Sequence, residues 1–151
     1  MIEFPKDFKE FLQLLDSKGI EYLVVGGYAV GYHGHPRATG DMDVWIAIHD
    51  DNAQRMVAAL ESFGFSQPEL TKELFLKEGN VIRMGVPPMR LEIITSIDGV
   101  EFDACYRNKV VEEIGNVHVN FISKADLIKN KRSSGRHRDL NDVEMLEHDS
   151  E

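Results

Sequence analysis

The sequence has little of several features that mark particular classes of protein. It holds a single cysteine, Cys105, which excludes an internal disulfide and a cysteine-based zinc cluster, so we expect this thiol to be a small core residue. No apolar run approaches the roughly 18 residues that a membrane span needs. The first residues are acidic and amphipathic and show no secretory signal, so we expect a cytoplasmic protein without a membrane partner.

Positive charge is also scarce. The chain has 17 Lys and Arg against 26 Asp and Glu, a formal net charge of −9 at pH 7. Because Lys and Arg supply most contacts to nucleic-acid phosphates, we do not expect an extended nucleic acid as a partner. Residues 123–139, SKADLIKNKRSSGRHRD, form a basic island in this acidic chain, and its charge suits a compact polyphosphate.

The remaining composition is that of a soluble globular domain. The chain has 151 residues, of which 42% are hydrophobic and 28% charged. This length and composition are sufficient to bury a hydrophobic core without disulfides or structural metal ions. It has no repeat, low-complexity tract or long linker. We therefore predict one domain over residues 1–147 and a frayed end at residues 148–151.

Hydrophobic periodicity predicts both helices and strands along the chain. Helices are expected over residues 4–18, 28–34, 50–65, 123–134 and 138–148. Strands are expected over residues 21–27, 42–48, 73–79, 80–86, 89–95, 109–114 and 117–122. This order predicts an α+β fold with a mixed β-sheet flanked by helices.

Two acidic residues stand at the start of one expected strand. The alternation of side chains along a strand places Asp41, Asp43 and Trp45 on one face and the apolar Met42 and Val44 on the other. The apolar face is expected to pack against the hydrophobic core. The aspartates then point together into a cleft, roughly 6.5–7 Å apart, where they can share a hard cation such as Mg²⁺. Trp45 is expected to form a wall of this cleft or to pack beneath a helix.

A third carboxylate lies in another expected strand. Leu91 and Ile93 point to the core, so Glu92 points to the opposite face. Because burying a lone charge is costly, Glu92 is a candidate to bind the catalytic ion or to help deprotonate an attacking hydroxyl. The alternatives are an exposed strand position or a salt bridge to Arg90 or Arg83.

The glycine pair Gly26-Gly27 ends an expected strand and opens a short helix. Backbone can therefore approach a ligand closely, and amides at the start of the helix can point at phosphate oxygens. A plain turn is the alternative. Arg37 and Thr39, in the loop before the aspartates, are placed to reach a phosphate or to position Asp41.

Lys131 is the candidate phosphate ligand within the basic island. It follows Leu127 by four residues and Ile128 by three, so it shares their helical stripe and faces the body of the protein. An inward lysine needs an anionic partner, and a triphosphate or the carboxylate cluster would serve. Arg136 and Arg138 either assist or are solvated. His33 and His35 are expected first as loop or helix-end residues, with contact to a nucleotide or acceptor as the alternative.

The stretch VVGGYAVGYHGHPRATGDMDVWI resembles the nucleotidyltransferase superfamily of DNA polymerase β type. The motif of that family is an apolar residue and a glycine pair, then a spacer, then two acids separated and followed by apolar residues. Here it is matched by Val25, Gly26, Gly27, thirteen intervening residues, Asp41, Met42, Asp43 and Val44. Together with RLEIITSIDG and DLIKNKRSSGRHRDLNDVE, it is similar to small stand-alone bacterial nucleotidyltransferase-like proteins related to minimal and abortive-infection types.

The resemblance implies a nucleotidyltransferase fold and a role for each matching residue. Gly26 and Gly27 would contact the triphosphate of an NTP, and Asp41 and Asp43 would bind Mg²⁺, with Mn²⁺ as the alternative ion. Glu92 would complete the triad, at a position where the family more often has Asp.

Two functions follow as expectations. The first is transfer of a nucleoside monophosphate from an NTP, most simply ATP, to a hydroxyl of a small molecule or protein side chain, with release of pyrophosphate. The second is a weak or inactive nucleotide-binding component of a toxin–antitoxin or phage-defence pair that acts through a partner protein. The presence of Glu92 at a position where the family more often has Asp is the feature that supports this second function as an alternative.

Overall fold

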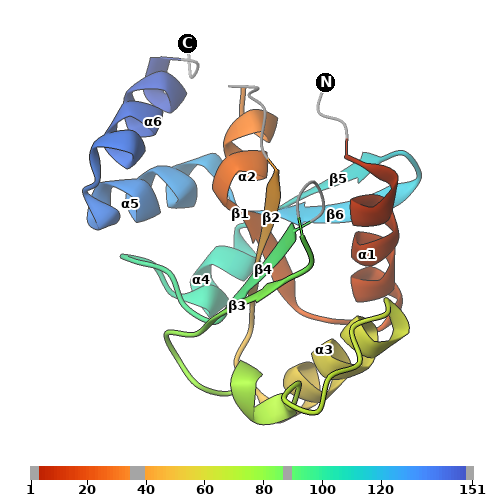
Figure 1. Ribbon diagram of the computed structural model, residues 1–151. Coiled ribbons are helices and arrows are strands. Elements are labelled where there is room, and N and C mark those ends of the chain that lie inside the picture. The colour runs from red at the N-terminus through yellow and green to blue at the C-terminus, as the bar shows by residue number, and fades with distance from the viewer. Residues whose placement is uncertain (1–3, 35–39, 87–89, 149–151) are drawn as a thin grey trace.

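A computed structural model describes residues 4–34, 40–86 and 90–148. Within these residues one mixed sheet is built from β1 (Tyr22–Val25), β2 (Asp41–Ile46), β3 (Val81–Met84), β4 (Arg90–Ile94), β5 (Val110–Ile114) and β6 (Val117–Phe121). The spatial order is β3-β4-β2-β1-β6-β5 (Figure 1). β2 runs antiparallel to β1 and parallel to β4, and β1 runs parallel to β6. The predicted α+β class with a mixed sheet is confirmed.

The helices occur between the strands and after them. They are α1 (Lys6–Ser17), α2 (Gly26–Tyr32), α3 (Asp50–Ser62), the 3-10 helix η1 (Lys72–Phe75), α4 (Phe102–Arg107), α5 (Lys124–Ser134) and α6 (His137–His148). In the described residues, no helix has both the length and the apolar character that crossing a membrane would require.

The helices cover both faces of the sheet. α1 and α3 lie on one side and α4, α5 and α6 on the other (Figure 1). Met42 and Val44 of β2 have no exposed surface and belong to the hydrophobic core, as the strand alternation predicts. Asp43 and Trp45 point the opposite way, toward the layer of α4 to α6, so β2 is the boundary between the core and the candidate site.

The termini of α5 explain why this helix can be predicted from the sequence. The Ser123 hydroxyl accepts a hydrogen bond from the backbone N–H of Asp126 at 3.1 Å, which satisfies a free donor at the start of the helix. Gly135 ends the helix with a φ of 67°, in the left-handed region that glycine adopts without strain. These two residues fix the length of α5 and therefore the position of Lys131.

The local structure differs from the expectations at three places. Residues 73–79 are not a strand: they form the end of η1 and a turn, because Phe75 is buried in the core and the Asn80 side chain donates to the Leu74 carbonyl at 2.9 Å. The helix α4 is not predicted, because its six residues are too few for a periodic pattern. The strand predicted over residues 21–27 ends at Val25, where α2 begins.

Candidate functional site

The pairing of β2 with β4 brings the acidic residues of two distant segments together. The parallel register places Asp43 beside Glu92 and Asp41 beside Arg90. Neighbouring strands lie about 4.7–4.9 Å apart, so Asp43 and Glu92 are close enough to interact directly. The predicted carboxylates therefore gather on one face of the sheet.

Asp43 carries the strongest sign of a functional group. Its Oδ1 is buried and has no hydrogen-bond partner in the described part of the chain. Burial, followed by the hydrogen bond to Glu92 and by repulsion from Glu92 and Asp41, raises the pKa of Asp43 to about 8, against a lowering effect of Lys131. A carboxyl group in these surroundings is stabilised by a proton or by a metal cation.

The carboxylates have the chemistry that a hard divalent cation requires. Carboxylate oxygens are the ligands that Mg²⁺ and Mn²⁺ favour, and the unpaired Oδ1 of Asp43 offers one such oxygen without breaking a contact. The donor set therefore fits a divalent ion. In the described residues, however, no group of three or more His, Cys, Asp or Glu side chains is already arranged around a metal position.

Two ion pairs engage the neighbouring acids in the structure. The Arg90 guanidinium donates to both carboxylate oxygens of Asp41, at 3.1 and 2.9 Å. Arg83 donates to Glu92 at 2.8 Å, which is one of the salt bridges that the sequence offered as an alternative. Both arginines are partly exposed, so these pairs are solvated contacts of modest strength.

Gly26 lies directly against Asp43. Its φ is 68°, and a Cβ placed on it would overlap with the Asp43 Oδ2. Only glycine allows this approach, so the turn from β1 into α2 and the aspartate form one unit. The close neighbour of Gly26 in the structure is thus the Asp43 carboxylate, and the predicted approach of the glycine pair to a ligand stays a prediction.

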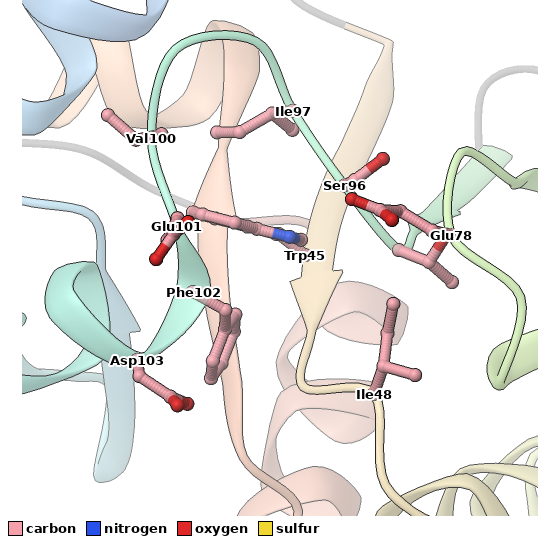
Figure 2. Close-up of a pocket in the computed structure, with 10 residues that line it drawn as sticks. Trp45, Ile48, Glu78, Ser96, Ile97, Val100, Glu101, Phe102 and Asp103 are labelled. Carbon is pink, nitrogen blue, oxygen red and sulfur yellow. The ribbon is translucent and has the colours of Figure 1, made fainter.

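Trp45 lies two residues after Asp43 on the same face of β2. Its ring packs edge to face on Phe102 of α4, with centroids 5.1 Å apart and planes at 83° (Figure 2). Of the two alternatives from the sequence, packing beneath a helix is the one that the structure shows. Trp45 does not line the cavity that Asp43 lines. Cys105, also in α4, is fully buried, as expected for a small core residue.

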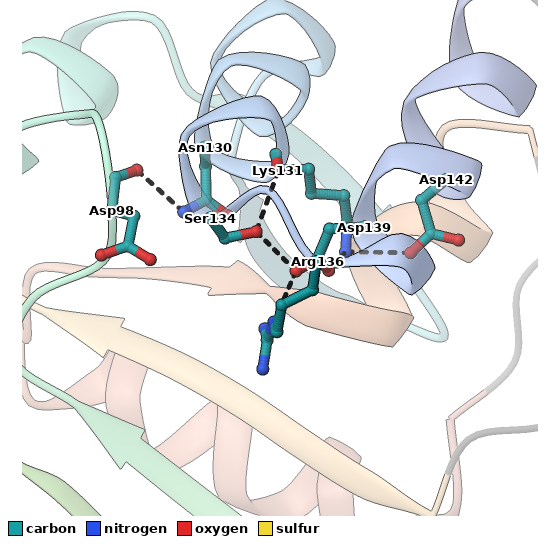
Figure 3. Close-up of polar contacts among 7 residues, drawn as sticks. All are labelled: Asp98, Asn130, Lys131, Ser134, Arg136, Asp139 and Asp142. Carbon is teal, nitrogen blue, oxygen red and sulfur yellow. Dashed lines mark hydrogen bonds and ion pairs between the residues drawn. The ribbon is translucent and has the colours of Figure 1, made fainter.

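Lys131 of α5 faces inward, as its helical stripe predicts, and is 7% exposed. Its Nζ lies 3.2 Å from Asp139 Oδ1 and 3.0 Å from Asp142 Oδ2, both on α6 (Figure 3). The anionic partners in the structure are therefore these two aspartates, whereas the sequence suggested a triphosphate or the carboxylate cluster of the strands.

Asp139 is the centre of this network. Ser134 donates to its Oδ2 at 2.5 Å and Arg136 donates to the same oxygen at 2.8 Å (Figure 3). Burial raises the pKa of Asp139, but the hydrogen bonds from Ser134, Arg136 and Lys131 outweigh it and bring the pKa to about 2. Asp139 is therefore ionised at neutral pH and fixes both cations.

Asp139 and Asp142 were not predicted as site residues, although their spacing in the sequence indicates that they are buried. Asp139, Asp142, Val143 and Leu146 are all buried and follow one another at helical spacing along α6. Two acids in an apolar stripe require a buried cationic partner. In the structure, Lys131 is the partner of both aspartates.

A cavity of about 310 Å³ joins the two halves of the site. Its lining includes Gly26 and Asp43 from the sheet side and Lys131, Arg136 and Asp139 from the side of α5 and α6. The structure thus brings together four residues that the sequence nominated from segments far apart: Gly26, Asp43, Lys131 and Arg136. The cavity carries both carboxylate and cationic groups, as a metal–phosphate ligand requires.

The other predicted residues do not line this cavity. Asp41 and Glu92 lie on the two strands beside it, held in their ion pairs. Gly27 lies within α2. Arg37 and Thr39, like His35, fall outside the described residues.

The remaining basic candidates have ordinary structural surroundings. His33 follows α2, and its Nε2 lies 2.7 Å from the Ile122 carbonyl oxygen, so it is a helix-end residue as first expected. Burial lowers the pKa of His33, against the effect of this hydrogen bond. Arg138 is exposed, whereas Arg136 reaches Asp139 while its own side chain remains 79% exposed.

No protein-family model and no curated protein matches the sequence, but solved structures do. The lincosamide antibiotic adenylyltransferase LnuA, solved with lincomycin bound, has a TM-score of 0.60 at 16% identity over 95% of this chain and 96% of its own. An antigenic nucleotidyltransferase-like protein from Paracoccidioides brasiliensis has 0.56 at 20% identity, over 91% and 72% of the two chains. A candidate nucleotidyltransferase from Thermotoga maritima has 0.56 at 15% identity, over 93% and 86%.

These likenesses define the architecture. The chain has the nucleotidyltransferase fold, and the fold predicted from the motif GG with two spaced aspartates is confirmed. Membership of the small stand-alone bacterial branch stays a prediction.

Proposed function

We propose that the protein transfers a nucleoside monophosphate from an NTP, with ATP as the first candidate, to a hydroxyl acceptor and releases pyrophosphate. The observation that carries this proposal is Asp43: a buried carboxyl with an unpaired oxygen, beside Glu92 in the register and against Gly26, at the wall of a cavity. The nucleotidyltransferase fold supports the same reading.

A divalent ion, Mg²⁺ or Mn²⁺, would be held by Asp41, Asp43 and Glu92. When bound, it would neutralise charge on the triphosphate and align the α-phosphorus. Asp41 and Glu92 must exchange their contacts with Arg90 and Arg83 for this role. Both ion pairs are partly exposed, so their loss costs little.

The phosphates would be bound from both sides of the cavity. Lys131 faces it from α5, and Arg136 lies at the turn between α5 and α6. Backbone amides of Gly26 and Gly27 would contact phosphate oxygens from the opposite side. Arg37 and Thr39, in the loop before Asp41, complete the proposed nucleotide-binding set.

The transfer exchanges one phosphorus–oxygen bond for another and moves one proton. The acceptor hydroxyl oxygen bonds to the α-phosphorus, while the bond from this phosphorus to the bridging oxygen breaks and its electron pair leaves with pyrophosphate. The hydroxyl proton passes to the carboxylate of Glu92. Lys131 stabilises the negative charge that develops on the leaving pyrophosphate.

We favour a small molecule or a protein side chain as the acceptor. The net charge of −9 disfavours a long nucleic acid. The similar structure LnuA, which the chain matches over nearly the whole length of both proteins, is a lincosamide antibiotic adenylyltransferase. Cytoplasmic location remains an expectation.

A second candidate function has its own supporting observation. Asp41 and Glu92 are both engaged by arginines, and the described residues contain no ready-made metal group. A protein that keeps this arrangement would bind nucleotide without turnover and would act through a partner, as in a toxin–antitoxin or phage-defence pair.

The transfer proposal is tested with α-phosphate-labelled ATP, GTP, CTP and UTP, each with Mg²⁺ or Mn²⁺. Lincomycin and a tyrosine-containing peptide serve as acceptor probes. The variant Asp41→Asn/Asp43→Asn should lose all transfer and all pyrophosphate release. The matched variant Asp16→Asn/Asp51→Asn, which removes two exposed carboxylates, should keep them.

The outcomes separate the two functions. Label transfer that survives the Asp41→Asn/Asp43→Asn change would contradict the proposed mechanism. Saturable nucleotide binding with no transfer to any probe and no pyrophosphate would instead favour the second candidate.

A further inference from the structure

A second cavity, of about 250 Å³, lies beside the first. Ser96 and Ile97, in the segment that links β4 to α4, line both cavities and separate them. Figure 2 shows this segment arching over Trp45, with α4 on one side and Glu78 on the other. The proposed transfer uses none of the other residues of this second cavity.

About half of the cavity lining is apolar. Trp45 and Phe102 form an edge-to-face pair, and Ile97, Val100 and Ile48 add aliphatic surface (Figure 2). Ile48, two residues after the end of β2, is 39% exposed. An apolar wall with two aromatic rings favours the hydrocarbon part of a ligand over water.

Among the described residues, the ionisable groups that line this cavity are all acids. They are Glu78, Glu101 and Asp103, whose side chains are exposed at its rim. The first cavity differs, because Lys131 and Arg136 line it together with its aspartates. The second cavity therefore attracts cations and repels anions, including a nucleotide.

Trp45 supplies an independent indication of a ligand. The residue is 2% exposed, and its indole Nε1 is buried without a hydrogen-bond partner in the described part of the chain. In Figure 2 the nitrogen edge of the ring points to the side on which Ser96, Glu78 and Ile48 lie. A buried donor without an acceptor costs free energy, so a ligand that offers an acceptor atom here gains affinity.

We propose that this cavity is a binding site for a small organic cation with an apolar body and a hydrogen-bond acceptor, such as an arylalkyl amino alcohol. The ammonium lies toward the carboxylates at the rim. The apolar body lies on Trp45 and Phe102, and the acceptor atom meets the indole N–H once the exposed Ile48 and Glu78 side chains turn aside. This site does not depend on nucleotide transfer.

Trp45 provides the readout, because it is the single tryptophan of the chain. The probes are phenylalaninol, a cation at neutral pH, its neutral derivative N-acetylphenylalaninol, and the anion 3-phenyllactate. All three carry a phenyl ring and a hydroxyl. We expect phenylalaninol to change the tryptophan emission saturably, the neutral compound to bind at least about fivefold more weakly, and the anion not to bind.

The hydrogen bond has a separate signature in the wild-type protein. The chain gives one indole N–H resonance in a proton–nitrogen spectrum, and phenylalaninol should move it downfield. Equal affinity for the three probes, or an indole resonance that does not move at saturation, would overturn the proposal.

The charges are tested by the variant Glu78→Gln/Glu101→Gln/Asp103→Asn. Three exposed carboxylates that each act on a nearby cation should together weaken phenylalaninol binding by about tenfold. The indole resonance of the free variant, unchanged from the wild type, shows that the fold is kept.

The control variant is Glu61→Gln/Glu69→Gln/Glu144→Gln. It changes the net charge by the same amount at three exposed positions outside the cavity. It should bind phenylalaninol like the wild type. An equal loss in both triple variants would mean that the probe responds to overall charge and would refute the site.

Discussion

At the scale of single residues, the candidate site depends on contacts that leave no room for substitution. Gly26 and Asp43 are 17 positions apart in sequence, yet a side chain on the glycine would occupy the space of the aspartate carboxylate. The aspartate in turn keeps one oxygen unpaired. Sites of this kind trade stability for the ability to hold a ligand.

We predict that Gly26→Ala destabilises the fold through two effects, backbone strain and overlap with Asp43. Strain at positive φ alone costs about 1–3 kcal/mol, and the overlap adds to it. Gly19→Ala isolates the first effect, because Gly19 has a φ of 67° and a Cβ placed on it would meet only the Arg55 guanidinium at an ordinary contact distance of 3.9 Å. Urea denaturation should show a larger loss of unfolding free energy for Gly26→Ala than for Gly19→Ala, and equal losses would contradict the close contact.

At the scale of elements, the pair α5 and α6 is held together by a buried ionic network. Lys131 on α5 is bonded to two aspartates of α6, and Asp139 receives further hydrogen bonds from Ser134 and Arg136. This arrangement holds the cations at the mouth of the cavity. It also makes the orientation of α6 dependent on charge.

We predict that Lys131→Met destabilises the protein by about 3–5 kcal/mol, because it leaves buried aspartates without their cation. Lys129→Met is the matched control, since Lys129 lies on the same helix but is exposed. Thermal and urea denaturation of both variants checks the difference. A Lys131→Met protein as stable as the control would show that the ion pairs contribute nothing to the fold.

The pKa of Asp139 gives this network a defined dependence on pH. Its value in the folded protein is about 2, below the usual 3.8, so its contribution is fully present above about pH 4 and is lost as the pH falls toward 2. Urea denaturation at a series of pH values should therefore show a steeper acid loss in the wild type than in Asp139→Asn. Asp16→Asn, at an exposed position, should keep the wild-type slope, and identical slopes in all three proteins would refute this assignment.

Local sequence signals explain which elements could be predicted. The limits of α5 follow from Ser123 and Gly135, residues that act on their own helix. The segment 73–79 contains three consecutive apolar residues, 74–76, which suit a strand, but tertiary packing of Phe75 favours η1. Short elements such as α4 lack a pattern, because they are fixed by what they pack against.

At the scale of the whole molecule, the fold and half of the site follow from the sequence. The spacing of Gly26, Asp41 and Asp43 identifies the fold, and the inward stripe identifies Lys131 as buried. The partners of these residues could not be predicted in the same way. Contacts of Arg90 with Asp41, or of Lys131 with α6, depend on strand pairing and helix packing between distant segments.

The overall charge leads to a prediction about partners. With a net charge of −9, the protein should not bind a single-stranded oligonucleotide of about 30 nucleotides at physiological salt, because Lys and Arg supply the phosphate contacts and are outnumbered by Asp and Glu. Fluorescence anisotropy with a labelled oligonucleotide tests this expectation. Tight binding that weakens steeply with salt would contradict the preference for a small acceptor.

The measurement that tests the central claim most directly is calorimetric binding of α,β-methylene-ATP, which needs no acceptor. We predict binding that requires Mg²⁺ or Mn²⁺ and is at least about tenfold weaker in Asp43→Asn, since contacts of charged groups contribute about 1.5–3 kcal/mol each. Asp16→Asn should bind like the wild type. Metal-independent binding, or unchanged affinity in Asp43→Asn, would contradict the assignment of a metal–nucleotide site to Asp43 and its cavity.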